Sequence, residues 1–573
     1  MAALSMGRRA REYRRIAADW TLLVGLLVTA LFLAVAILLP LIKILGTALS
    51  AEALPIFSRY FTSPVYLRTI INTIELGVLV GLFGTALGFL FAFVQVRVDV
   101  PFKSFMNLMA LVPVVSPPFA VATSAIVLFG RSGILTYKLL GIRYDLYGLN
   151  GLVFVLVLSL FTVAYMNLAG MMGALDPALD EAATNMGANK WDIFRTVTLP
   201  MLIPGIAGSF LLLSVEAMAD LANPLVMGGD FTVLASRIYI AILGEYDVLA
   251  GAVLSVILLV PSLTVFILQR YWVSRKSVVS VTGKPSGKPQ LITDPIAKWT
   301  LFAVAMFFSL LILVVYGTVF VGAFTQLLGI DNSFTLDHFV FVLFGIGLKA
   351  MTDTTTLSAI ATPIAGILGV VIAWLVVRKR FTGQTALDFS SMLGIAVPGT
   401  VIGIGYVLAF RNPVEIGGVT LLPSLQGGTA LAGGAIALIL AYVVRSVPAG
   451  VRAGAAALQQ IDPSIEEAST DLGADSATTF RKVTLPLIRP ALLVGLVSGF
   501  ARSMTSISAI IFLTTPETKI MTAQILNEVD AGRFGNAFAY CVILILIVLA
   551  VIGALNVFVG TSGGVERELG TSL

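Results

Sequence analysis

Four ionisable residues lie inside stretches that are otherwise almost free of charge, namely Glu75, Glu216, Asp220 and Arg502. A charged side chain at membrane depth is costly, and where one occurs it usually belongs to a pathway, a gate or an internal ion pair. Glu216 and Arg502 occupy equivalent positions of an internal repeat, so we expect them either to pair across its axis or to act in gating. We favour both of these roles over direct contact with the substrate. The sequence offers Asp220 and Glu75 no partner. The four residues carry a summed charge of −2, which mildly favours a cationic substrate over a phosphate anion.

Residues suited to catalysis or metal binding do not gather in these stretches. A single cysteine and a single histidine exclude an intramolecular disulfide and a His-rich metal site. No nucleophile–base pair recurs, so a membrane-embedded enzyme has no support. The phosphate-binding frame Gly-x-x-x-x-Gly-Lys-Ser/Thr is absent, because "GKPSGKP" at 283–289 has the wrong spacing and no Ser or Thr after its second Lys. We therefore expect no catalytic residue, no metal site and no cofactor in this chain.

One polar segment occurs twice in this apolar chain, 286 residues apart. "EAATNMGANKWDIFRTVTLP" covers residues 181–200, and "EASTDLGADSATTFRKVTLP" covers residues 467–486. The retention of this polar segment in both places indicates that a partner outside the membrane recognises both copies. A pair of ordinary loops left by a gene duplication is the simpler alternative. The shared positions are Glu181, Ala182, Ala183, Gly187, Leu199 and Pro200 in the first copy, and Glu467, Ala468, Ser469, Gly473, Leu485 and Pro486 in the second.

The local signals predict the shape of both loops, 176–200 and 462–486. Each begins with Asp-Pro, a helix-start signal, followed by acidic residues that suit a helix N-terminus. The glycine then ends the helix, and Asn189 or Asp475 can cap a second short helix before Leu-Pro starts the next long apolar stretch. Ala182, Ala183 and Ala468 are small enough to let another surface approach closely. We therefore expect a short helix, a glycine break and a second short helix in each loop.

The elements that hold these loops are membrane spans. Only 12% of the residues are charged, 58% are hydrophobic and the mean hydropathy is +0.99, whereas a soluble domain carries about twice that charged fraction. Uncharged runs long enough to cross a bilayer recur along the chain. The fold class is therefore an all-α polytopic membrane protein with about twelve transmembrane helices. We place the spans at about 20–43, 70–96, 104–130, 147–172, 200–225 and 248–270, and at about 298–324, 353–377, 389–410, 430–452, 488–513 and 536–560.

Basic residues give the orientation. With both termini in the cytoplasm, 24 of the 36 Lys and Arg residues fall on the cytoplasmic side and 10 on the external side, while Lys43 and Arg502 lie within spans. This bias is the positive-inside pattern. It also accounts for the net charge of +5 without a nucleic-acid partner. Both polar loops then face the cytoplasm, between the fourth and fifth span of each set.

The two sets of six spans form a parallel repeat. "NTIEL" at 72–76 aligns with "DTTTL" at 353–357, and the same offset of 281 pairs Arg97 with Arg378 and Pro117 with Pro398. Repeats of like orientation are related by an axis along the membrane normal. We accordingly divide the chain into a first domain, 1–273, a polar cytoplasmic linker, 274–296, and a second domain, 297–573.

The repeated frame resembles the cytoplasmic-loop motif of permease subunits of binding-protein-dependent ABC importers. The motif is Glu-Ala-Ala, three residues, Gly, nine residues, an aliphatic residue, one residue and Leu-Pro, and only Ser469 departs from it. The resemblance covers nearly the whole chain and implies the type I importer permease fold. It also implies that each loop carries a coupling helix for one of two cytoplasmic ABC ATPase copies, which bind the ATP and Mg. A single substrate-binding protein outside and the bacterial cytoplasmic (inner) membrane complete the expected setting.

A fused double permease resembles the ferric-iron type most closely, with thiamine, phosphonate and sugar-phosphate importers as relatives. Ferric iron is therefore the expected substrate, and those three classes are the alternatives within the importer family. A secondary transporter with two six-helix halves is the alternative from another class. It predicts the same spans but has no need of two matched cytoplasmic docking loops.

Overall fold

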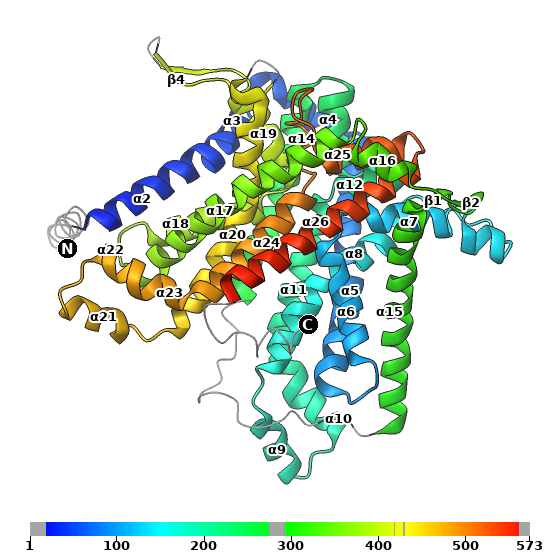
Figure 1. Ribbon diagram of the computed structural model, residues 1–573, viewed down its shortest axis with the longest axis horizontal. Helices are drawn as coiled ribbons and strands as arrows, with labels where there is room; N and C mark the ends of the chain where they lie inside the picture. The colour runs from blue at the N-terminus through cyan, green and yellow to red at the C-terminus, as the bar shows by residue number, and fades with distance from the viewer. Residues whose placement is uncertain (1–18, 274–290, 293, 417–418, 428–429, 561–573) are drawn as a thin grey trace. The chain divides into compact units, whose positions relative to one another are not determined.

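The described chain is almost entirely helical, as the long apolar stretches predict (Figure 1). The computed structural model describes residues 19–273, 291–292, 294–416, 419–427 and 430–560. In these ranges ten helices are long and apolar enough to cross a membrane, and two bent helix pairs raise the number to twelve. Each of the twelve overlaps a predicted span, although the third, Phe119–Leu139, begins well after the predicted start at 104. The all-α polytopic fold is therefore confirmed. Most of the predicted linker and both chain ends lie outside the described residues.

The third span of each half is broken at a proline pair or a single proline. In the first half the helix α6 ends at Val115 and α7 begins at Phe119, across Ser116-Pro117-Pro118. In the second half α18 and α19 meet at Val397-Pro398 with a bend of 105°. A residue before proline disfavours the helical region, and Ser116 and Val397 are both extended. The matched break positions follow from the repeat.

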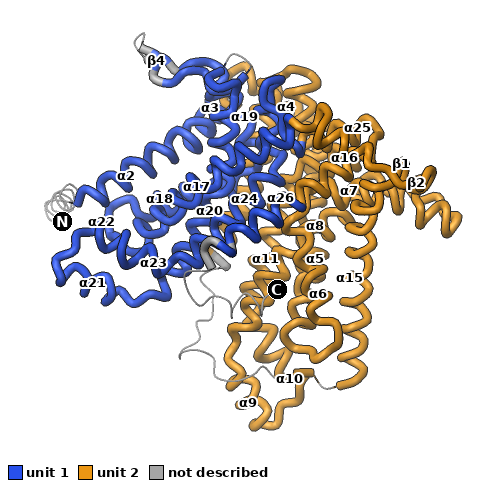
Figure 2. The backbone as a smooth tube through the Cα atoms, in the orientation of Figure 1, with its two compact units in different colours: residues 1–47, 349–522, 546–572 blue, residues 48–348, 523–545, 573 orange. Residues whose placement is uncertain are grey.

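The chain forms two compact units, coloured separately in Figure 2. Unit 1 comprises residues 1–47, 349–522 and 546–572. Its elements are α2 (Trp20–Leu33), η1 (Ala34–Leu38), α3 (Leu39–Ala48), α17 (Leu348–Arg378), α18 (Gln384–Ala396), α19 (Gly399–Phe410), β3 (Val414–Ile416), β4 (Val419–Leu422), η8 (Leu431–Gly434), α20 (Ala435–Gln460), α21 (Ser464–Asp471), α22 (Ser476–Thr479), η9 (Phe480–Thr484), α23 (Leu485–Leu487), α24 (Arg489–Thr505) and the second part of α26 (Phe534–Gly560). β3 and β4 form an antiparallel hairpin with Val414 opposite Leu422.

Unit 2 comprises residues 48–348 and 523–545, with the final residue. Its elements are η2 (Ala51–Ala53), α4 (Leu54–Thr62), α5 (Pro64–Arg97), α6 (Lys103–Val115), α7 (Phe119–Phe129), η3 (Ile134–Leu139), α8 (Leu149–Gly173), α9 (Pro177–Asn185), α10 (Lys190–Ile193), η4 (Phe194–Thr198), α11 (Leu199–Ala219), α12 (Ala222–Met227), α13 (Leu234–Tyr239), η5 (Ile240–Gly244), α14 (Val248–Leu268), η6 (Gln269–Val273), α15 (Pro295–Ala323), β1 (Thr325–Leu327), β2 (Asp331–Phe334), α16 (Asp337–Leu343), most of α25 (Met521–Asp530) and the first part of α26. β1 and β2 pair antiparallel, with Thr325 opposite Phe334.

The compact units divide the chain differently from the predicted halves. The first span of the first half, α2 to α3, packs within unit 1, where the Ala36 carbonyl accepts a 2.9 Å hydrogen bond from the Tyr406 hydroxyl. The first span of the second half, α15, packs within unit 2, where the Tyr316 hydroxyl lies 2.7 Å from the Ser116 hydroxyl. The ranges 1–273 and 297–573 therefore describe the sequence repeat, whereas each packed unit contains the first span of the other half.

The second span of each half, α5 or α17, is packed through small residues. Glycines at 77, 81, 84 and 88 of α5 align with Ser358, Thr362, Ala365 and Gly369 of α17. A Cβ added at Gly88 would lie 2.6 Å from the Ala164 Cβ, and one added at Gly369 would lie 2.9 Å from the backbone of Gly450. Small residues let helix backbones approach closely in membranes. These close approaches hold α5 and α17 firmly against α8 and α20.

Candidate functional site

The first polar loop folds as its sequence predicts. Asp176 caps α9, because its carboxylate accepts a 3.0 Å hydrogen bond from the backbone N–H of Ala178, and Pro177 occupies the first turn. Asn189 caps α10 by accepting a 3.0 Å hydrogen bond from the N–H of Asp192, whose carboxylate reaches back to the N–H of Asn189. The two short helices are thus each fixed by a local cap.

The second polar loop repeats this construction. Asp462 accepts a 2.9 Å hydrogen bond from the N–H of Ser464, and Asp475 accepts one of 2.9 Å from the N–H of Thr478. Here α21 begins one residue later than α9 does, at Ser464. These hydrogen bonds hold the pKa of both carboxyl groups, Asp462 and Asp475, below its usual range. The caps therefore stabilise the loop above the carboxyl pKa of the unfolded chain, and the benefit is lost as the pH falls through the lowered value.

A glycine ends the first short helix in both loops. Gly187 has φ +88° and Gly473 has φ +87°, which is the left-handed region that other residues rarely adopt. A Cβ at either position would meet nothing within 4 Å. The backbone conformation, rather than a lack of space, therefore requires glycine at both breaks, as predicted.

A buried ion pair ties each loop to the preceding second span. In unit 2 the Arg97 guanidinium, at the end of α5, bonds the Asp180 carboxylate of α9, and the two side chains are only 8% and 3% exposed. In unit 1 Arg378 Nε, at the end of α17, lies 3.2 Å from Glu466 Oε1 of α21. The Thr484 hydroxyl also donates to Glu466. Both pairs join the same positions of the repeat. The aligned arginines and the first-turn acids were visible in the sequence, but their pairing was not.

Each loop presents two exposed aliphatic side chains at matching positions. Leu179 and Ile465 are 42% and 44% exposed, and Met186 and Leu472 are 82% and 89% exposed. Both pairs are 286 residues apart, the offset of the loop motif. Exposed apolar residues that recur in this way mark a surface built to be covered. The offset shows that these positions are equivalent, but the sequence does not show that they are exposed.

The small residues of the motif divide between the surface and the interior. Ala182, Ala468, Glu181 and Glu467 are exposed and lie between the aliphatic positions. Ala183 is buried, at 6% exposure, so the expectation that it admits another surface is wrong. Ser469, its counterpart, is half-buried and lies 3.0 Å from the Thr479 hydroxyl within the same loop. The third position of the motif therefore packs the loop, and the first two face outward.

The Leu-Pro pairs begin the fifth spans. Leu199 and Leu485 follow the π-helical segments η4 and η9, which occupy equivalent positions of the repeat. Pro200 and Pro486 carry no N–H, so they fit the start of a helix. In the second half α23 and α24 are bent by 74° immediately afterwards, whereas α11 continues to Ala219.

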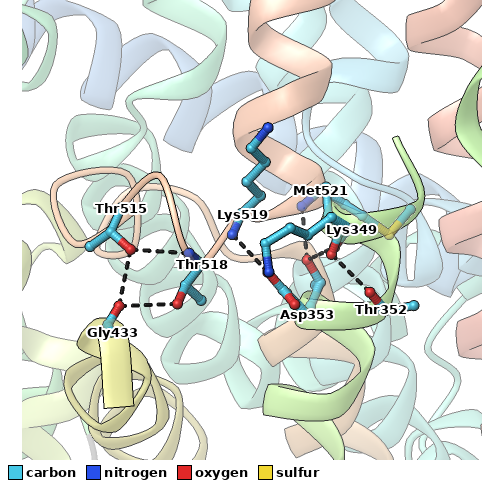
Figure 3. A network of polar contacts seen from close by, with 10 residues as sticks. Lys349, Thr352, Asp353, Gly433, Thr515, Thr518, Lys519 and Met521 are labelled. Atoms are coloured by element: carbon cyan, nitrogen blue, oxygen red, sulfur yellow. Dashed lines mark hydrogen bonds and ion pairs between the residues drawn. The ribbon is translucent and has the colours of Figure 1, made fainter. Parts of the chain in front are cut away.

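The far ends of α5 and α17 hold the segments that follow the fifth spans. In unit 2 the Asn72 amide donates to the Thr232 carbonyl at 3.0 Å, and the Thr73 hydroxyl accepts from the N–H of Leu234 at 2.8 Å. Residues 353 and 354 repeat this arrangement in unit 1 (Figure 3): the Asp353 carboxylate accepts from the Lys519 N–H at 2.9 Å, and the Thr354 hydroxyl accepts from the Met521 N–H at 2.8 Å. One helix in each unit thus bonds a polar loop at one end and the segment after the fifth span at the other.

A second set of bonds fixes the segment of unit 1 before Lys519. The hydroxyls of Thr515 and Thr518 both donate to the Gly433 carbonyl, at 3.0 and 3.1 Å (Figure 3). Residues 507 and 509–513 of this non-helical segment are buried. Non-helical backbone is tolerated at membrane depth only where protein or a cavity surrounds it. The segment is therefore an ordered, buried part of unit 1.

Glu216 and Arg502 lie at the ends of the fifth-span helices. The α11 helix ends with Asp220 as its C-cap residue and α24 with Ser506, positions that are 286 residues apart. Glu216 and Arg502 therefore lie in the last turn of their helices, just before the chain leaves the helical conformation. Arg502 suits the negative end of a helix dipole, whereas Glu216 does not. Glu216 belongs to unit 2 and Arg502 to unit 1, so their pairing stays a prediction.

Asp220 and Glu75 both have partners, contrary to expectation. The Asp220 carboxylate accepts hydrogen bonds from the backbone N–H and the side-chain amide of Asn223, at 3.0 and 2.9 Å. Asp220 therefore satisfies a backbone N–H in the first turn of the short helix α12 that follows the break. Glu75 lies 3.8 Å from Arg68, seven residues earlier on α5. The sequence did not reveal the Asp220 contacts, because it does not show where α11 breaks.

One family model matches the chain at two places. The model for binding-protein-dependent transport system inner membrane components matches residues 84–278 and again residues 365–560. One match falls in each half of the predicted repeat, and each includes one polar loop.

Curated relatives cover most of the chain. The ferric transport system permease protein FbpB of Actinobacillus pleuropneumoniae is 36% identical over 506 residues, which are 85% of this chain and 70% of that protein. The putative ferric transport system permease protein FbpB 1 of Haemophilus influenzae is 35% identical, over 81% of this chain and 72% of its own. The putative ferric transport system permease-like protein AfuB of Escherichia coli K12 is 48% identical over 103 residues, 18% of this chain and 86% of its own.

Proposed function

The chain belongs to the family of binding-protein-dependent transport system inner membrane components, and we propose that it forms the pathway of an ATP-driven importer for ferric iron. As a family member it is a multi-pass membrane permease that serves a substrate-binding protein. The relatives that share most of its length are named as ferric transport permeases, which supports iron over thiamine, phosphonate or sugar phosphates. The excess of acidic over basic residues among Glu75, Glu216, Asp220 and Arg502 agrees with a cationic substrate.

The observation that carries the ATP-driven mechanism is the matched pair of loops. Two copies of a cytoplasmic ABC ATPase bind them, one copy per loop, and supply the ATP and Mg. The exposed aliphatic residues at 179, 186, 465 and 472 form the apolar centre of each contact, with Glu181 and Glu467 beside them. Buried apolar anchors dominate the energy of most interfaces. In the orientation that the basic residues indicate, both loops and both chain termini lie in the cytoplasm.

The second spans carry motion from the ATPases to the pathway. Each is held at its cytoplasmic end by the ion pair to the docking loop, Arg97–Asp180 or Arg378–Glu466. At its other end each is bonded to the segment after the fifth span, through Thr73 or Thr354. A rigid helix with specific contacts at both ends transmits displacement, because packed interiors yield little. Movement of a docking loop therefore displaces the segment that follows Glu216 or Arg502.

The docking surface is tested by placing charge on it. Met186→Glu together with Leu472→Glu puts a carboxylate at the most exposed aliphatic position of each loop. We expect the purified permease to fold and to lose its cognate ATPase in co-purification. Leu431→Glu is the matched control, because Leu431 is 55% exposed and lies at the opposite end of α20 from the second loop. Retention of the ATPase by the double variant would show that the loops do not bind it.

The substrate is tested by uptake in vesicles that contain the permease, the ATPase and the cognate binding protein. Radiolabelled ferric iron should accumulate, and excess unlabelled thiamine, phosphonate or sugar phosphate should not compete. Competition by one of these compounds, with no accumulation of iron, would reassign the substrate and leave the ATP-driven mechanism in place.

A further inference from the structure

Unit 2 contains an apolar cavity of about 560 Å³ beside the first docking loop. Aromatic side chains form its walls: the ring centroids of Phe93 and Phe194 are 5.5 Å apart, those of Trp191 and Phe194 are 5.6 Å apart, and those of Phe89 and Phe93 are 5.8 Å apart. Leu301 of α15 closes another side. The volume lies in the range of small-molecule sites, which are mostly apolar with a few placed polar groups.

One polar group in this cavity lacks a hydrogen-bond partner. Arg97 lines the cavity and is 6% exposed, and its Nε is buried with no acceptor in the described part of the chain. Its Nη1 already bonds Asp180, so the charge of the guanidinium is compensated. A buried donor left unpaired destabilises the protein, because it has lost its hydrogen bonds to water. The remaining N–H therefore suits a neutral or singly charged oxygen acceptor, such as an ester carbonyl or a phosphodiester.

The cavity lies where two candidate membrane spans, Pro64–Arg97 and Pro295–Ala323, end or begin, which is the depth expected of the lipid headgroups. Arg97 ends the second span and Ala297, which also lines the cavity, lies in the first turn of the seventh span. Trp191 and Trp299 are 66% and 53% exposed around this level, and Lys298 lies over the Trp299 ring. Tryptophan and basic residues concentrate at membrane–water interfaces. Lys190 also lines the cavity, and its ammonium donates a hydrogen bond to the Leu291 carbonyl.

The corresponding residues of unit 1 contact one another. Trp374 occupies the position of Phe93, and its ring packs 5.2 Å from Phe480 and 4.6 Å from Lys379 Nζ. Ser476 stands at the position of Lys190 and donates to Asp19 at 2.6 Å, beside Lys379. The two docking loops are therefore alike on their outer face and different on the face toward the membrane.

We propose that the cavity beside the first docking loop binds one glycerophospholipid of the inner leaflet. The aromatic walls take the start of an acyl chain, and the free Arg97 N–H bonds an ester or phosphate oxygen. The cavity is lined by two basic and two acidic residues, Arg97, Lys190, Asp180 and Asp294, so a net anionic headgroup is not required. The bound lipid packs against the membrane-facing side of the first docking loop. In the second docking loop the side chain of Trp374 takes this place.

Native mass spectrometry of the permease released from nanodiscs of phosphatidylethanolamine and phosphatidylglycerol tests this site. The wild-type chain should retain one phospholipid at detergent concentrations that strip the rest. Phe93→Trp copies position 374 and fills the cavity, so the occupancy should fall at least tenfold. Phe83→Trp is the matched control, because Phe83 is 51% exposed on the same helix and does not line the cavity. It should leave the retained lipid unchanged.

Three results would overturn the proposal. These are no retained phospholipid on the wild-type chain, equal retention by Phe93→Trp and Phe83→Trp, and a retained adduct whose mass is not that of a phospholipid. Should Phe93→Trp fail to fold, Trp191→Ala removes one wall of the cavity instead, and the same measurement should again show loss of the lipid. Retention that discriminates between the two headgroups would show which lipid the site prefers.

Discussion

At the scale of single residues, the two glycines of the docking loops are the most constrained positions of the motif. Both have a positive φ in open space, so a side chain there strains only the backbone. Gly187→Val and Gly473→Val should each cost roughly 1 kcal/mol in loop stability and tilt the docking helix. We expect normal membrane insertion and reduced uptake, measured in reconstituted vesicles.

Gly170→Val is the control for this prediction. Gly170 lies in the helix α8, where a Cβ also meets nothing within 4 Å, but its φ is not positive. Uptake should therefore stay near the wild-type rate. If the double variant at 187 and 473 transported as well as Gly170→Val, the glycine breaks would have no role in docking.

Glu216 and Arg502 are predicted to meet in the pathway. Removing one member of a buried ion pair leaves an uncompensated charge that costs about 3–5 kcal/mol. Glu216→Gln or Arg502→Gln alone should therefore impair stability and uptake strongly, whereas Glu216→Arg with Arg502→Glu should recover much of the loss. A double-mutant cycle on thermal stability and uptake measures the coupling. Purely additive single effects would mean that the two side chains do not interact.

At the scale of elements, α5 and α17 are the proposed links between the docking loops and the pathway. Thr73→Val and Thr354→Val keep the side-chain shape but remove the hydroxyl that accepts a backbone N–H from the segment after the fifth span. An unsatisfied buried N–H costs about 1–3 kcal/mol. We expect the ATPase to bind normally and the ATP hydrolysed per transported ion to rise, because the link to the pathway is loosened.

Thr123→Val provides the control, since Thr123 is equally buried but its hydroxyl bonds only carbonyls of its own helix, Phe119 and Ala120. Its coupling ratio should match the wild type. An unchanged ratio in the Thr73 and Thr354 variants would remove the second spans from the transmission path.

Much of this element structure could be predicted from the sequence. Span positions follow from apolar length, and the docking loops follow from local caps and glycines, signals that act over a few residues. The Arg97–Asp180 bond and the Thr73–Leu234 bond join residues 83 and 161 positions apart. Only tertiary packing brings such residues together, so their types alone could not reveal the contact. The break at Asp220 was missed because α12 resumes the helix within two residues and hides it in the apolar pattern.

At the scale of the whole molecule, the packed units do not follow the boundary of the repeat in the sequence. Besides an exchanged first span at each start, unit 2 also contains residues 523–545 of the second half. Unit 1 contains α2 and α3 from the first half, and unit 2 contains α15 from the second. The repeat in the sequence reflects a duplication, whereas the packed units depend on which apolar helix faces pack against each other. Each half therefore depends on the other for its first span, and we expect a chain cut in the linker to function only when both fragments are produced together. Independent transport by the 297–573 fragment alone would contradict this expectation.

The central claim is that ATP hydrolysis by a separate subunit drives import through this chain. The most direct measurement is ferric-iron uptake into proteoliposomes that contain the permease, with loaded binding protein outside and with the ATPase and ATP inside. We expect uptake only when permease, ATPase and hydrolysable ATP are all present, and no ATP hydrolysis by the permease alone. Uptake by the permease without the ATPase, driven by a proton or sodium gradient, would contradict the account and identify a secondary transporter.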